Sequence, residues 1–310
     1  AWGLNGFGQL GDGSESDKNI PTKIGNEYNW QTMAIANYHS LAIKIDGTLW
    51  SWGYNNKGQL GNGNTFNSTA AKQITTLTDI IDATGGEEHS IALRNNGEIW
   101  TWGRNSEGEL GDGTTAQRSL PVQVYGINAI AIAAGRYHSL ALSANGTVWA
   151  WGYNVNGQLG NGNNTNQIRP VQISGLTNIV AIAAGEDHSL AIKNDGTVWA
   201  WGLNNVGQLG NKSFTNQNKP VQVTGLGFVT SISISKQSLF VTPGSGMQLY
   251  WATGYNANGQ IGDSTLLNRN VRVLVRFPID QNNNGIPDWN DFNDDLSTDG
   301  DRDGLKDWEE

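Results

Sequence analysis

The residues whose types and spacing most clearly indicate chemistry lie at the end of the 310-residue chain, over 299–310. Carboxylates occupy positions 1, 3, 5, 9 and 12 of this stretch, and Gly304 falls at position 6. A calcium-binding loop has this spacing, because the glycine allows a sharp turn and position 7 offers a backbone carbonyl. The predicted calcium ligands are Asp299, Asp301, Asp303, Leu305 through its carbonyl, Asp307 and Glu310.

A second loop with the same spacing begins at Asp280, 19 residues before Asp299. Amides replace two of its carboxylates and Asp291 ends it, so we expect this site to bind calcium more weakly. Its predicted ligands are Asp280, Asn282, Asn284, Ile286 through its carbonyl, Asp288 and Asp291. The alternative for the whole stretch is an acidic tail that holds no metal.

No clear helical pattern precedes either loop, and together the loops resemble the thrombospondin type 3 calcium repeats of secreted bacterial proteins. More loosely, they are similar to a dockerin, which implies a cohesin as partner. The resemblance covers 280–310 only. It implies Ca²⁺ as a cofactor, and loops of extracellular modules bind calcium at roughly 10⁻⁴–10⁻³ M. We therefore expect a bacterial protein that is exported or displayed at the cell surface, with 277–310 as a calcium-stiffened spacer.

The net charge of −9 resides in this tail. Residues 280–310 include 11 acidic and 2 basic residues, which leaves 17 of the 28 acidic and 17 of the 19 basic residues in 1–279. A neutral body argues against nucleic acid as the main partner, because phosphate binding needs clustered Lys and Arg. No apolar stretch reaches the length of about 18 residues that predicts a membrane span. The absence of cysteine excludes disulfides and thiolate metal sites.

The body of the chain is an internal repeat, and the repeat must position any other functional residue. The motif Trp-Gly-x-Asn-x-x-Gly-Gln-Leu-Gly begins at Trp2, Trp52, Trp102, Trp151 and Trp201, with Glu109 replacing Gln in the third copy and a degenerate copy at Thr253. The copies are 50, 50, 49, 50 and 52 residues apart. A second motif, His-Ser-Leu/Ile-Ala, begins 13 residues before the next Trp-Gly, at His39, His89, His138 and His188.

One period predicts three to four short strands. The apolar run 179–185 has the length of a strand that is buried on both faces, and 170–173 starts an extended piece with a proline. The residues 189–193 and 197–202 show the side-chain alternation of strands. Asp195-Gly196 lies between them and is a strong hairpin signal. Such a sheet cannot bury both faces alone, so we predict an all-β propeller of four-stranded blades over 1–276. A β-solenoid is the alternative, although its coils are usually shorter than this period.

The repeat resembles the regulator of chromosome condensation repeat. The clearest copy reads Gly185-x-x-His188-Ser189-Leu190-Ala191, Asp195-Gly196 and Trp201-Gly202-x-Asn204-x-x-Gly207-Gln208-Leu209-Gly210. The resemblance implies a seven-bladed propeller. Only five full intervals and flanking pieces are present here, so we expect an N-terminally truncated ring that lacks about two blades and any signal peptide.

Function on a repeat scaffold is expected where the copies differ, which is before the His and after the Trp-Gly. Both places are predicted turns at strand ends, so we expect equivalent turns to gather on the propeller faces. Tyr and Arg are favoured interface anchors. The predicted ligand-binding residues are Tyr38, Tyr54, Arg104, Arg136, Tyr137, Tyr153 and Tyr255. We expect a non-enzymatic module that binds an extracellular protein or a glycan.

Other residues recur in every copy, which favours structural roles. Each histidine is expected to hydrogen-bond a neighbouring turn. The paired tryptophans, such as Trp199 and Trp201, are expected to pack blade against blade, and carbohydrate stacking is the alternative. The G-x-G-x-x-G pattern over 6–11 is incidental, because the corresponding positions of other copies lack its first glycine.

Three alternative functions remain open. Similarity to β-lactamase-inhibiting relatives would imply a propeller that binds a target enzyme. A polysaccharide lyase or hydrolase would need clustered carboxylates, for which Glu87, Glu88, Glu186 and Asp187 are the candidates. The founding family members promote guanine-nucleotide exchange on a small GTPase and dock on chromatin, but the neutral body and the calcium-loop tail oppose that function here.

Overall fold

The computed structural model describes residues 1–25, 29–235, 237–243 and 248–275. These residues form five four-stranded antiparallel sheets, here called blades 1 to 5. Blade 1 contains β1 (Trp30–Ile35), β2 (His39–Lys44), β3 (Leu49–Gly53) and β4 (Ser68–Gln73). Blade 2 contains β5 (Ile80–Gly85), β6 (His89–Arg94), β7 (Ile99–Gly103) and β8 (Arg118–Val124). Blade 3 contains β9 (Ala129–Ala134), β10 (His138–Ser143), β11 (Val148–Gly152) and β12 (Gln167–Gln172). Blade 4 contains β13 (Ile179–Ala184), β14 (His188–Lys193), β15 (Val198–Gly202) and β16 (Gln217–Val223). Blade 5 contains β17 (Ser231–Ile234), β18 (Gln237–Pro243), β19 (Gln248–Gly254) and β20 (Arg269–Leu274).

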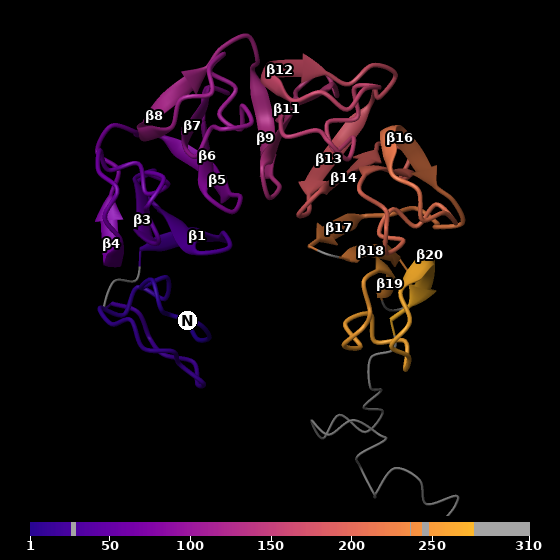
Figure 1. Cartoon of the computed structure of the whole chain (residues 1–310), viewed down its shortest axis with the longest axis horizontal. Coiled ribbons are helices and arrows are strands. Elements are labelled where there is room, and N and C mark those ends of the chain that lie inside the picture. Colours follow the sequence, from indigo (N-terminus) through magenta and orange to yellow (C-terminus); the bar gives the residue numbers. More distant parts are fainter. Residues whose placement is uncertain (26–28, 236, 244–247, 276–310) are drawn as a thin grey trace, which may run out of the picture.

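The blades lie side by side around a common axis, as the propeller prediction requires (Figure 1). Within each blade the strands pair in sequence order, and the first strands of neighbouring blades contact each other nearest the axis. The described residues form an arc that is open between the N-terminal segment, residues 1–25, and blade 5 (Figure 1). The N-terminal segment contributes a short antiparallel bridge between Gly3 and Lys18. None of the described residues forms a helix long and apolar enough to cross a membrane.

The order of burial across a blade differs from the sequence prediction. The second strand is the most buried, and β14 is buried along nearly its whole length. The first strand, predicted to be buried on both faces, is only partly covered because it faces the axis. A β-bulge in β13 also pushes Val180 outward, where it is 56 % exposed. Pro170 lies inside β12 and not at its start, which the outer edge strand tolerates at an irregular stretch of pairing.

One backbone carbonyl joins each pair of consecutive blades. In blade 1, the carbonyl of Gln59 accepts hydrogen bonds from Trp102 Nε1 and Ser90 Oγ of blade 2, both at 2.8 Å. The same pair of donors reaches Gln9, Glu109 and Gln158, whereas Thr253 replaces the indole at Gln208. The nearby Gly61 has a φ of +69°, and a Cβ there would lie 2.8 Å from the Trp102 indole nitrogen. We call this contact between consecutive blades the joint.

The histidines belong to the joint. His89 Nε2 lies 3.1 Å from Ser139 Oγ of the next blade, and the serine hydroxyl donates to the carbonyl of Glu109. The imidazole must therefore carry its hydrogen on Nε2 and donate to the serine. The other three histidines make the same bond to Ser90, Ser189 and Ser238. The predicted partner was a turn, but the actual partner is a strand serine that lies beside the axis-facing first strand. Complete burial lowers the pKa of each histidine to about 3.

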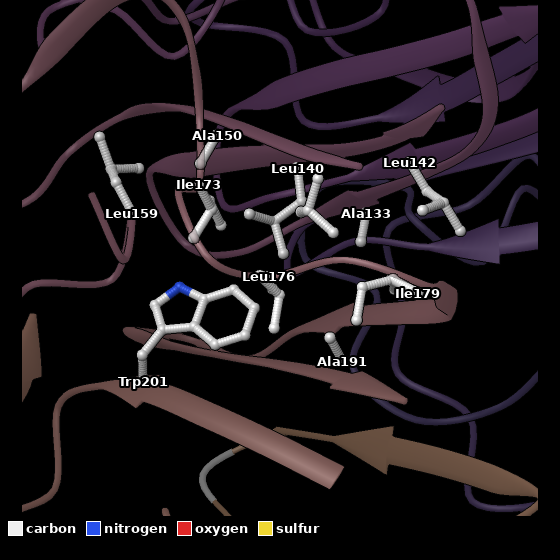
Figure 2. Packing of buried hydrophobic residues seen from close by; sticks show 11 residues of the cluster. Ala133, Leu140, Leu142, Ala150, Leu159, Ile173, Leu176, Ile179, Ala191 and Trp201 are labelled. Carbon is white, nitrogen blue, oxygen red and sulfur yellow. The ribbon is translucent and has the colours of Figure 1, made fainter. Parts of the chain in front are cut away.

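The core is built between blades, which confirms packing for the second tryptophan of each pair. Figure 2 shows Trp201 of β15 facing Leu159, Ile173 and Leu176 from the preceding blade. The first tryptophan of each pair is half-buried, and Trp50, Trp100 and Trp199 lie beneath a cation. Lys193 Nζ is 4.4 Å from the centre of the Trp199 ring, which also packs on this core cluster. Trp199 therefore offers little free face to a sugar.

Candidate functional site

The variable turns gather at one end of the axis, as predicted. We call this surface the axial mouth: it comprises the turns between the first and second strands and the residues that follow each Trp-Gly. Backbone hydrogen bonds link these turns from blade to blade. Glu87 N donates to Arg136 O at 3.1 Å, and Arg136 N donates to Glu186 O at 2.9 Å. Glu186 N in turn lies 3.4 Å from Ser235 O. The mouth is therefore a continuous surface held in place by main-chain contacts.

A polar hollow of about 350 Å³ lies at the centre of the mouth, where the ends of the first strands meet. The turns of blades 1, 3, 4 and 5 supply the polar side chains Asn37, Arg136, Glu186 and Ser235, and β5 of blade 2 adds Thr84. Glycine and alanine form most of the remaining wall, because the turns pack closely. A Cβ on Gly185, for example, would lie 2.5 Å from the carbonyl oxygen of Ser235. We call this cavity the axial hollow.

The two predicted arginines of the mouth are held by carboxylates. Arg104 forms an ion pair with the buried Glu109, and it lies 3.8 Å from Glu88 and 3.5 Å from Glu107. Burial raises the pKa of Glu109, and Arg104 opposes that rise. Arg136 forms an ion pair with Glu87, and this hydrogen bond raises the pKa of the guanidinium.

The predicted tyrosines of blades 1 to 3 contact these arginines or each other. Tyr137 lies under Arg104, with the guanidinium carbon 4.1 Å from the ring centre, and under Arg136 at 5.0 Å. Its ring also meets that of Tyr153 edge-on, at 6.4 Å between centres. Burial raises the pKa of Tyr137. With Tyr38 and Tyr54, described below, six of the seven predicted anchors therefore already have side-chain partners within the chain.

Phe7 completes the aromatic group of blade 1, and the sequence interpretation missed it. The Phe7 ring lies 4.4 Å from that of Tyr54 and 5.8 Å from that of Tyr38, and the two tyrosine rings lie 6.0 Å apart. Phe7 belongs to a third variable position of the repeat, two residues before the Gln of the Trp-Gly motif. That position is Lys57, Glu107, Asn156, Val206 and Asn258 in the other copies. The variation at this position between copies was the sequence signal that could have identified Phe7.

The seventh predicted anchor, Tyr255, lines a separate hollow of about 180 Å³ between blades 4 and 5. We call it the blade 4–5 hollow. Leu203 and Val206 supply apolar surface there, and Asp187 supplies a carboxylate. Burial raises the pKa of Asp187, whose Oδ1 lies 3.3 Å from Gln158 Nε2. Glu186 and Ser235 line both this hollow and the axial hollow, so the two cavities adjoin.

The four candidate catalytic carboxylates divide between two places. Glu87 and Glu88 of blade 2 lie beside arginines, whereas Glu186 and Asp187 of blade 4 line the blade 4–5 hollow. The structure therefore does not bring the four together in one cluster. Within the described ranges, no group of three or more His, Asp or Glu side chains could hold a metal ion. Both predicted calcium loops, 280–291 and 299–310, lie outside those ranges.

Comparison with solved structures supports the propeller fold. The human protein WBSCR16 has a TM-score of 0.75 at 22% identity, and the match covers 90% of this chain and 77% of that one. Yeast RCC1 (Prp20), in its complex with Kap60, has a TM-score of 0.75 at 22% identity over 89% and 71% of the two chains. Prp20p from Saccharomyces cerevisiae solved separately has a TM-score of 0.75 at 23% identity over 89% and 73%. No curated protein matches the chain as a relative.

Family models match most of the body. The model described as "Regulator of chromosome condensation (RCC1) repeat" matches residues 1–43, 46–93, 96–142, 145–192 and 195–241. A second model of the same description matches 80–109, 129–158 and 179–208. These segments contain the histidines, serines and tryptophans of the joint. The chain therefore belongs to the regulator of chromosome condensation (RCC1) repeat family.

Proposed function

We propose that this protein is a binding propeller that holds a protein partner at the axial mouth, over the blade 4–5 hollow. One observation carries the proposal: the two cavities of the mouth adjoin at Glu186 and Ser235, on the side where Tyr255 lines a hollow. A partner segment that crosses this point would contact both cavities.

The chemistry of the blade 4–5 hollow suits a protein side chain. Tyr255, Leu203 and Val206 supply aromatic and aliphatic surface, and Asp187 and Asn205 supply polar groups at its wall. Buried aromatic and aliphatic anchors surrounded by polar groups are typical of the centre of a protein interface. The arginine and tyrosine side chains of blades 1 to 3 would then flank the site as a preorganised wall.

The family supports protein binding on this fold. Yeast Prp20 was solved with Kap60 bound, and the structure of Prp20p was described together with its binding properties to Gsp1p and histones. Guanine-nucleotide exchange is the alternative that the resemblance to this family implies. The balance of 17 acidic and 17 basic residues in 1–279 favours a partner that is not highly charged. An inhibitor-type propeller that binds a target enzyme would use the same mouth.

We also propose an extracellular location, a bacterial source and a calcium-stiffened spacer over 277–310. The support is the spacing of carboxylates in the two loops, since Ca²⁺ requires six to eight oxygen ligands. The partner would then be an extracellular protein, or a glycan. Titration calorimetry with Ca²⁺ on the whole chain is expected to show binding, and Glu310→Ala should remove the tighter site. Absence of heat in the unchanged chain would contradict this part of the proposal.

Selection of displayed peptides on the whole chain tests the mouth. Peptides that bind are expected to lose at least about tenfold in affinity on Tyr255→Ala or Leu203→Ala, because each removes a buried anchor. The matched control is Tyr125→Ala, since Tyr125 is 77 % exposed and lines neither hollow. Peptides whose binding is unaffected by both mouth substitutions would contradict the proposed site.

A further inference from the structure

The blade 4–5 hollow presents hydrogen-bond acceptors to a group that enters it. Asp187 lines it with a carboxylate, and burial raises the pKa of that carboxyl although Arg136 opposes the rise. His188 also lines the hollow. Its Nε2–H donates to Ser238 Oγ at 2.9 Å, because the serine hydroxyl itself donates to the carbonyl of Gln208 at 2.8 Å. The second ring nitrogen of His188, Nδ1, is therefore an acceptor.

The amide groups of the hollow already have partners. Gln208 Nε2 lies 3.5 Å from Asn205 Oδ1, and Gln208 Oε1 accepts from Val206 N at 3.1 Å. Asp187 Oδ1 accepts from Gln158 Nε2, a neutral donor, at 3.3 Å. An ionised carboxylate has about four acceptor sites, so Asp187 retains capacity for an incoming donor.

The same chain places an arginine at the corresponding position of blade 2. Arg104 and Leu203 both follow a Trp-Gly. Glu88 and Asp187 both precede a histidine. Arg104 N donates to Glu88 O at 2.8 Å. Leu203 N donates to Asp187 O at the same distance, so the backbone relates the two pairs in the same way. In blade 2 the guanidinium lies 3.8 Å from the Glu88 carboxylate, and its carbon lies 4.1 Å from the centre of the Tyr137 ring. In blade 4 a leucine replaces this cation.

We propose that the blade 4–5 hollow receives an arginine side chain of the protein partner, with the guanidinium held between the Asp187 carboxylate and the Tyr255 ring. This inference rests on the proposed binding at the axial mouth and adds the chemistry of the partner residue. A guanidinium suits the hollow because it donates up to about five hydrogen bonds, accepts none and stacks on aromatic rings. Leu203 and Val206 would cover the aliphatic part of the side chain.

A partner arginine is expected to be held less tightly than Arg104 is. Arg104 contacts three carboxylates, those of Glu88, Glu107 and Glu109. Of these three positions, only that of Glu88 is acidic in blade 4, where it is Asp187. An isolated arginine should therefore bind with a dissociation constant of roughly 1 mM, and the remaining affinity would come from the rest of the partner. A single cation also agrees with the balanced charge of 1–279, because it requires no highly charged partner.

Titration of the whole chain with N-acetylarginine amide, from roughly 0.1 to 50 mM, tests the proposal. The chain is labelled with fluorotyrosine, and the fluorine NMR signal of Tyr255 is assigned from its loss in Tyr255→Phe. This signal is expected to shift in a saturable way as the probe binds. N-acetylcitrulline amide has a similar shape without the charge, and it should cause no saturable shift of the same signal.

Three variants locate the bound cation. Asp187→Asn should weaken arginine binding at least about tenfold, because the amide has a similar size and no charge. The matched control is Asp79→Asn, which removes an exposed carboxylate and introduces the residue of the corresponding Asn178, at a similar positive φ. It should leave the affinity unchanged. Leu203→Arg should abolish binding of the probe, since the new guanidinium takes the position that Arg104 has in blade 2.

Lys236 follows Ser235 in the sequence and lies outside the described residues. The titration is therefore repeated with Lys236→Gln, which removes its ammonium as a competitor. Absence of a saturable shift in both chains would overturn the proposal. Equal binding of the arginine and citrulline probes would also overturn it, as would an affinity that Asp187→Asn does not change. Peptides that still lose affinity on Tyr255→Ala would then support binding at the mouth, so the two proposals fail separately.

Discussion

The two sides of the axial mouth use similar residues in different ways. On the side of blades 1 to 3, Arg104, Arg136 and Tyr137 contact one another and the nearby carboxylates. On the side of blades 4 and 5, Tyr255 and Asp187 line a hollow. The comparison shows that a side chain typical of interfaces is not available for binding merely because it lies on a variable turn. Availability depends on the residues that the neighbouring blade places opposite it.

Both sides rest on the same histidine–serine bonds, and acid should weaken both sides together. The folded-state pKa of each histidine is about 3, below the unfolded value of about 6.5. The unfolded chain therefore binds more protons between these values, and the free energy of unfolding falls as pH decreases below about 6.5. Each histidine contributes a slope of up to about 1.4 kcal/mol per pH unit.

Chemical denaturation between pH 4 and 8 measures this effect. His188→Gln introduces the residue that blade 5 has at the corresponding position, Gln237. It should reduce the pH dependence of the unfolding free energy by the contribution of one histidine. An unchanged slope in that variant would show that the histidine is not buried in its neutral form.

Removing Arg104, on the side of blades 1 to 3, should lower the free energy of unfolding strongly. Arg104→Met leaves the carboxylate of Glu109 buried without its cation, and loss of one partner of a buried ion pair costs about 3–5 kcal/mol. The measurement is the free energy of unfolding in urea. The double variant Arg104→Met/Glu109→Gln should recover much of the loss, because four other joints use glutamine at this position. A double variant no more stable than the single one would contradict the ion-pair explanation.

Tyrosine substitutions on the two sides of the mouth should differ in their effect on the free energy of unfolding, by less than the loss expected for Arg104→Met. Tyr137→Ala removes a ring that lies beneath two guanidinium groups and against Tyr153, with an expected loss of about 1–3 kcal/mol. Tyr255→Ala, on the side of blades 4 and 5, should change the free energy of unfolding by no more than about 0.5 kcal/mol. Equal losses in thermal or urea unfolding would mean that the two sides do not differ as described.

The smallest expected effects have opposite signs. Glu87→Gln weakens the ion pair with Arg136 and should lower the stability by about 0.2–1 kcal/mol. Asp187→Asn should raise it slightly at pH 7, because burial raises the pKa of that carboxyl and an amide needs no charge. The gain should shrink as the pH falls toward the unfolded pKa of aspartate, since the native carboxyl is then protonated. A loss of stability in both variants at pH 7 would remove this distinction.

Repeat spacing predicted the blades well and their contacts poorly. Asp195-Gly196 predicted the turn between β14 and β15, and the Trp-Gly interval predicted the number of sheets. The bond from His89 to Ser139 joins residues one period apart, so no local pattern indicates it. The pairing of Arg104 with Tyr137 has the same cause, because it exists only after two blades pack together. Residues that vary between copies were correctly placed at the mouth, but their partners depend on that packing.

The uniformity of the joint also bears on how such a chain can change in length. Blades 1 to 4 each offer the next blade a carbonyl and a glycine, and the next blade supplies a serine with an indole or, in blade 5, a serine with a threonine. A tandem duplication of one whole period would therefore insert a blade whose two faces already match those on either side. Gene duplication can lengthen this arc without any compensating substitution in the neighbouring repeats. Loss of a fraction of a period would instead place mismatched faces in contact, so lengths differing by whole periods are the ones that selection can sample.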